Sequence, residues 1–68
     1  MHKSYTLHRC VKPSPFNNGK DSNALEWFDG NLFDAAVTRY HEMVKDYPEE
    51  KFLLIEAILS EKTILGGE

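Results

Sequence analysis

The spacing of apolar residues predicts one amphipathic helix in this 68-residue chain, over residues 31–47. Asn31 has the side chain of an N-cap, and Pro48 ends the run because a residue that precedes proline is driven out of the helical region. A helix of this length needs a partner surface in water, so we expect the flanking segments to cover its apolar side. The apolar positions recur every three or four residues, as on one helix face: Phe33, Ala36, Val37, Tyr40, Val44 and Tyr47.

Two strands are predicted before this helix. Over residues 3–12, Tyr5, Leu7 and Val11 stand at the two-residue spacing of a half-buried strand. Residues 13–23 contain two prolines and an Asn-Gly pair, which predict a loop. Residues 24–29 fit either a short strand or a single helical turn with a capping box. Their aromatic side chains favour the strand.

The segment from residue 50 to residue 65 fits either a helix or a strand. Pro48 and the acids after it resemble a helix start, and Gly66 a helix stop. On a helix, however, the polar residues of this segment would scatter and leave no polar face. We therefore favour a strand over residues 51–60 and a tail over residues 61–68. The odd positions of that strand form a wholly apolar face, which we expect to lie against the helix: Leu53, Ile55, Ala57 and Leu59.

Together these elements predict a single α+β domain with the order β-β-α-β. The three strands would form an antiparallel sheet in the order 2-1-3, with the helix packed on one face. A composition of 41% hydrophobic and 28% charged residues is typical of a globular domain. A chain this short buries only about 60% of its unfolded surface, so its core is small.

The single cysteine excludes a disulfide within the chain, and we find no signal peptide and no apolar run long enough to cross a membrane. We therefore expect a cytoplasmic protein without a membrane partner. The net charge of −3 is unevenly distributed: residues 1–20 carry +4, and residues 21–68 carry −7. Such a distribution fits a solvated surface, or a segment that meets a partner of opposite charge.

No catalytic or metal-binding motif is found. His41-Glu42 resembles the start of a zinc-hydrolase helix, but Lys45 stands where that motif requires a second histidine. His8 and Cys10 would project from one side of a strand near His2, which suggests a zinc or copper site with too few ligands. We therefore expect no metal, no cofactor and no enzymatic activity.

The side of the sheet away from the helix is the expected partner-binding surface. Loop residue Phe16 is interpreted as an anchor packed under its loop or as an exposed contact, the anchor being favoured. The partner would be another protein or a second copy of this chain. Arg9, Lys12 and Lys20 offer a basic contact, but so few cations argue against a nucleic-acid partner. The residues predicted for this surface are Phe52, Leu54, Ile58, His8, Cys10 and Phe16.

Part of the chain resembles short phage- and prophage-encoded proteins. The resemblance lies in the first strand, in Phe28-Asp29 before the helix, in Pro48 after it, and in residues 51–57. It implies the β-β-α-β layout and a phage origin, and therefore the cytoplasm of a host cell. Such proteins are largely uncharacterised, so the resemblance implies no particular activity, but many of those that are understood are small binders that block a host enzyme, and on this basis we expect an inhibitor or modulator. Trp27 and the long loop depart from the pattern, which suggests a different partner surface.

Overall fold

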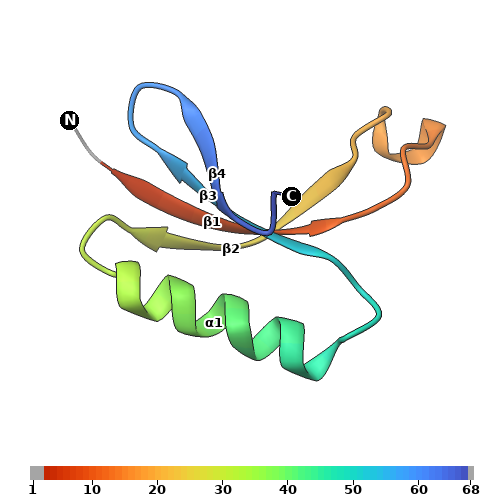
Figure 1. The fold of residues 1–68 in the computed structure, drawn as a ribbon. Coiled ribbons are helices and arrows are strands. Elements are labelled where there is room, and N and C mark those ends of the chain that lie inside the picture. The colour runs from red at the N-terminus through yellow and green to blue at the C-terminus, as the bar shows by residue number, and fades with distance from the viewer. Residues whose placement is uncertain (1–2, 68) are drawn as a thin grey trace.

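The computed structural model describes residues 3–67, which form one antiparallel sheet and one α-helix (Figure 1). The sheet has four strands in the order β2-β1-β3-β4, and each neighbouring pair is antiparallel. The helix α1 lies against one face of this sheet. In chain order the elements are β1 (Ser4–Cys10), a short 3₁₀ turn η1 (Pro15–Asn17), β2 (Ser22–Asp29), α1 (Phe33–Asp46), β3 (Phe52–Ala57) and β4 (Glu61–Leu65).

The predicted α+β class, with one helix and an antiparallel sheet, is confirmed, but the prediction of three strands is wrong. The segment assigned to a tail forms β4, which pairs with β3 through a tight turn over residues 58–60. Accordingly β3 ends at Ala57 and not at residue 60. Gly66 follows β4 with φ of +82°, a conformation that favours glycine. This glycine therefore ends a strand rather than a helix.

The helix begins two residues later than predicted. Leu32 occupies the N-cap position and its side chain makes no capping hydrogen bond, so the prediction that Asn31 caps the helix is wrong. At the other end the Tyr47 N–H donates to the Met43 carbonyl at 2.9 Å, just before the expected stop at Pro48. Ala36 is fully buried at the centre of the face that α1 turns toward the sheet.

The core lies between α1 and the sheet. Leu7 of β1 stands directly opposite Leu54 of β3, and Leu54 packs with Ala36 beneath the helix. Tyr5 also belongs to this cluster, and its ring stacks at a tilt on Phe33 with centroids 5.2 Å apart. Because buried residues of paired strands share a face, the even positions of β3 point toward α1.

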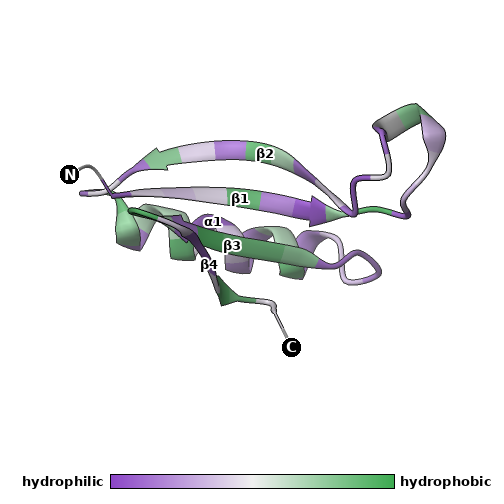
Figure 2. Ribbon diagram, turned by 90° about the horizontal axis from the view of Figure 1, so that it is seen from above, coloured by the Kyte–Doolittle hydropathy of each residue, from purple (hydrophilic) through white to green (hydrophobic). Residues whose placement is uncertain are grey.

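The predicted orientation of β3 is therefore wrong, since its odd positions were expected to face the helix. Both faces of β3 carry large apolar residues, with Glu56 near the end of the strand, and Figure 2 shows most of the strand as hydrophobic. The strand's own composition thus does not distinguish its two faces. The register with β1 does, because it sets Phe52 opposite Arg9 and Leu54 opposite Leu7, on the side that carries the helix.

Candidate functional site

The sheet face opposite α1 is covered by no element of the chain that the structure describes (Figure 1). We define this open face by the strand residues that alternate with the buried ones and so point away from the helix. Trp27 stands at its edge and exposes 62% of its surface. The open face comprises Thr6, His8, Trp27, Leu53, Ile55 and Thr63.

Two segments rise above the open face, one at each end. Figure 1 shows that the turn between β3 and β4 and the loop between β1 and β2 both bend away from α1. The turn presents Leu59, which is 84% exposed, with Ile58 beside it. The loop presents Phe16 on η1, which is fully exposed. Each raised end therefore carries an apolar side chain into solvent.

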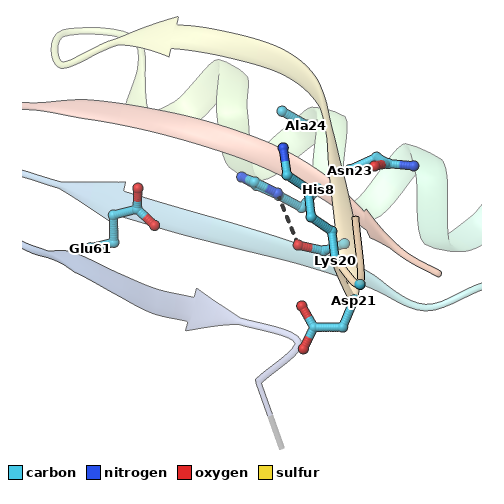
Figure 3. A pocket seen from close by; sticks show the side chains of 8 residues that line it. His8, Lys20, Asp21, Asn23, Ala24 and Glu61 are labelled. Atoms are coloured by element: carbon cyan, nitrogen blue, oxygen red, sulfur yellow. Dashed lines mark hydrogen bonds between the residues drawn. The ribbon is translucent and has the colours of Figure 1, made fainter. Parts of the chain in front are cut away.

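Between these two ends lies a shallow hollow of about 530 Å³ (Figure 3). Glu61 lies on one side of it, and Lys20 and Asp21 lie on the other. The Ser22 hydroxyl oxygen is 3.3 Å from Nδ1 of His8, within hydrogen-bond distance. This hollow is therefore mainly polar and carries charges of both signs. The lining residues are His8, Gly19, Lys20, Asp21, Ser22, Asn23, Ala24 and Glu61.

A second hollow of similar volume, about 530 Å³, lies on the other side of the sheet, beside α1. The helix packs on β1, β2 and β3, and its backbone does not come close to β4, although Ile64 and Leu65 pack against the core cluster. This leaves Tyr40 and Val44 of α1 facing a space that Phe52 and Leu65 also line. The apolar side of the helix is therefore only partly covered by its own sheet.

Two of the residues predicted for the partner surface are in the core instead. Phe52 is 1% exposed and Leu54 is 0% exposed, because the even positions of β3 lie under α1. Their predicted exposure on the far face is wrong for that reason. Ile58 is exposed, but it belongs to the turn after β3 and not to the strand.

The remaining predicted residues lie on the side away from the helix. His8 is on the open face, and Cys10 follows it on the same side, half-buried and free of any disulfide. Phe16 is exposed, so the preferred interpretation of this residue as a buried anchor is wrong. Leu59, which was expected to face the helix, is exposed and was missed, and Trp27 was noted as a sign of a different partner surface but was not among the predicted contact residues. The alternation of Trp27 with Phe28, which packs against the core, was the available signal.

The predicted basic residues do not form one surface. Arg9 lies on the helix side of β1, where its Nη1 is 3.3 Å from a carboxylate oxygen of Glu50. Lys20 lines the hollow on the opposite side of the sheet, and Lys12 is exposed in the loop. A ligand that contacts Lys20 from the open side would therefore not reach the guanidinium of Arg9.

Among residues 3–67 no group of three or more histidine, cysteine or acidic side chains is arranged to hold a metal ion. His2, which was considered beside His8 and Cys10, lies outside the described residues. Within the same range no helix has the length and apolarity required to cross a membrane.

Comparisons of the chain with protein-family models, with curated proteins and with solved structures gave no match.

Proposed function

We propose that this chain is a small, non-enzymatic protein-binding module whose open face engages another protein. The observation that carries this proposal is the group of exposed apolar side chains on the side that the helix does not cover, together with a polar hollow on the same side. Trp27, Leu59 and Phe16 are its main apolar members. Burying such side chains contributes roughly 25 cal/mol per Å² of apolar surface, and exposed aromatic residues are typical anchors of protein interfaces.

The shape of the open face favours a protein with a convex surface. Such a partner would contact the two raised ends through apolar groups and would meet the polar hollow between them. Lys20, Asp21 and Glu61 carry charges of both signs around this hollow, so the partner is expected to present charges of both signs in return. An arrangement of apolar contacts and oriented charges favours one mode of binding over others.

The resemblance to phage-encoded proteins supports a narrower proposal. We infer that the partner is a host protein, that the chain acts in the host cytoplasm, and that it inhibits or modulates that partner. Covering a functional surface of an enzyme is sufficient to block it, so this role needs no catalytic group in the chain. Support comes from Phe28-Asp29, from the helix that ends before Pro48, and from residues 51–57.

The test is a quantitative capture from host lysate on the immobilised chain. Wild type is compared with a Trp27→Ala, Leu59→Ser double variant, and Leu32→Ser serves as the matched control. Leu32 is also an exposed apolar residue, at 45%, but it lies at the start of α1, in the helix layer. We expect wild type and Leu32→Ser to capture the same stoichiometric partner, and the double variant to lose about tenfold or more.

Two results would count against the proposal. Equal capture by all three proteins would show that the open face is not the binding surface. The absence of a stoichiometric partner across the plausible hosts would show that the chain does not bind a host protein. Nuclease treatment of the lysate separates a nucleic-acid bridge from direct protein binding, because only the former is lost.

A further inference from the structure

The strand β2 forms one edge of the sheet and is unpaired along its outer side. It is eight residues long and contains neither lysine nor proline, the residues with which many proteins protect an exposed edge. The opposite edge, β4, has only five residues. The strand β2 is therefore the longer and less protected edge. Which of its N–H and C=O groups point outward decides which strand could pair with it.

Two hydrogen bonds fix that direction. The Val11 N–H donates to the Asp21 carbonyl at 2.9 Å, and the Cys10 N–H donates to the Lys51 carbonyl at 2.8 Å. In an antiparallel pair, residues alternate between bonding the neighbour on one side and the neighbour on the other. Odd positions of β1 therefore bond β2, and even positions bond β3. The β2 residues opposite the even positions turn their N–H and C=O groups outward: Ser22, Ala24, Trp27 and Asp29.

The spacing of these outward positions is irregular. The register shifts between Leu7 and His8, which leaves Leu25 as one additional residue in β2 between Ala24 and Glu26. The outward positions are therefore separated by two, three and two residues. A regular strand presents its groups every two residues, so it would match one half of β2 and fall out of register beyond the bulge.

A second copy of β2, running antiparallel, has the same spacing of two, three and two. We propose that β2 pairs with β2 of a second copy across a two-fold axis, with Ser22 opposite Asp29 and Ala24 opposite Trp27. The two four-stranded sheets then form one continuous sheet. In this register all four outward positions meet outward positions, whereas any other register aligns at most two of them.

The side chains also fit this register. Asp21, Glu26 and Asp29 would stand opposite Gly30, Leu25 and Ser22 of the second copy, so no acid opposes an acid. Trp27 would lie across from Ala24 of the second copy, so one flank of the exposed indole ring packs on that alanine while its outer face stays on the open side.

The inner and outer pairs contribute differently. The Asp29 carbonyl already accepts the Leu32 N–H at 2.9 Å, so each outer pair bonds through the Asp29 N–H and the Ser22 carbonyl. The Ala24–Trp27 pairs make both hydrogen bonds and are the centre of the interface. The pairing places both open faces on the same side of the joined sheet. The proposed dimer does not depend on whether the proposed partner protein exists.

A proline at position 24 tests the pairing. The Ala24 N–H points outward, so Ala24→Pro removes a donor to the second copy and leaves the pairing with β1 intact. Thr63→Pro is the matched control, because Thr63 is the corresponding outward position of the other edge strand, β4. By sedimentation at on the order of 50 µM, we expect twice the chain mass for wild type and Thr63→Pro, and the single chain mass for Ala24→Pro.

Wild type at the single chain mass up to roughly 1 mM would overturn the proposal, as would a folded Ala24→Pro protein that remains a dimer. Amide hydrogen exchange of wild type gives a second readout, which stands even if Ala24→Pro does not fold. The N–H groups of Ala24 and Trp27 should exchange about tenfold faster on dilution, while the Asn23 N–H, which faces β1, should not change. Exchange of Ala24 and Trp27 that is independent of concentration would contradict the pairing.

Discussion

The two faces of the sheet differ far more in burial than in composition. Toward α1, Leu54 is 0% exposed, whereas its neighbour Leu53 points to the open face and is only half-buried. Both are leucines of the same strand, so hydrophobicity alone does not explain the difference. The helix explains it, because a single helix covers one face of a sheet and leaves the other to solvent or to a partner.

The largest expected effect comes from shortening these two leucines. Leu54→Ala leaves a cavity in the core and should lower the free energy of unfolding by about 3 kcal/mol, against about 1 kcal/mol for Leu53→Ala. A domain of this size has a total stability of roughly 3–10 kcal/mol, so the first variant should be close to unfolding. Urea denaturation followed by circular dichroism measures both. Equal losses would show that the two faces are equally packed and would remove the contrast between them.

The same strand shows how far the sequence alone predicts this fold. Periodicity predicted β1 and α1 and favoured a strand over a helix for β3, whereas aromatic side chains favoured the strand at β2. It did not assign the faces of β3, whose two sides are both apolar. Only the pairing of Leu54 with Leu7, a contact between distant segments, decides which side meets the helix. The candidate surface was accordingly predicted with two core residues, Phe52 and Leu54.

The fourth strand was missed for a different reason. Glu61, Lys62 and Thr63 are exposed and show no apolar alternation, because β4 is an edge strand that packs on few neighbours. Its backbone pairing with β3 forms it, and a polar edge strand leaves little signal in the sequence. The turn before it contains Ile58 and Leu59 in place of the usual glycine or asparagine, which concealed the hairpin.

The second largest expected loss of stability comes from replacing Gly66, the glycine that follows β4. A Cβ at Gly66 would lie much closer to the Phe52 carbonyl oxygen than van der Waals contact allows, and φ of +82° is unfavourable for other residues. Gly66→Ala should therefore lower stability by about 2 kcal/mol, from backbone strain together with the clash. Gly19→Ala, in the loop above the open face, has φ of +73° and open space around it. It should cost about 1 kcal/mol from strain alone.

Thermal denaturation of both glycine variants separates the two contributions. If Gly66→Ala lowered the stability no more than Gly19→Ala, the backbone at the end of β4 would be able to move away from the added Cβ. This strand would then be packed more loosely than the rest of the sheet.

The smallest expected effect lies where the helix side meets the sheet edge. Arg39 of α1 is 3.7 Å from a carboxylate oxygen of Glu26 on β2, and both side chains are more than a third exposed. An ion pair in such a position contributes about 0.5 kcal/mol or less and weakens as salt is added. A double-mutant cycle of Arg39→Gln and Glu26→Gln measures this coupling by urea denaturation.

Glu42→Gln is the control, because it removes only the contact of Arg39 within the helix. A coupling above about 1 kcal/mol that persists in high salt would mean that ion pairing, and not only the buried cluster around Leu54, fixes the helix to its side of the sheet.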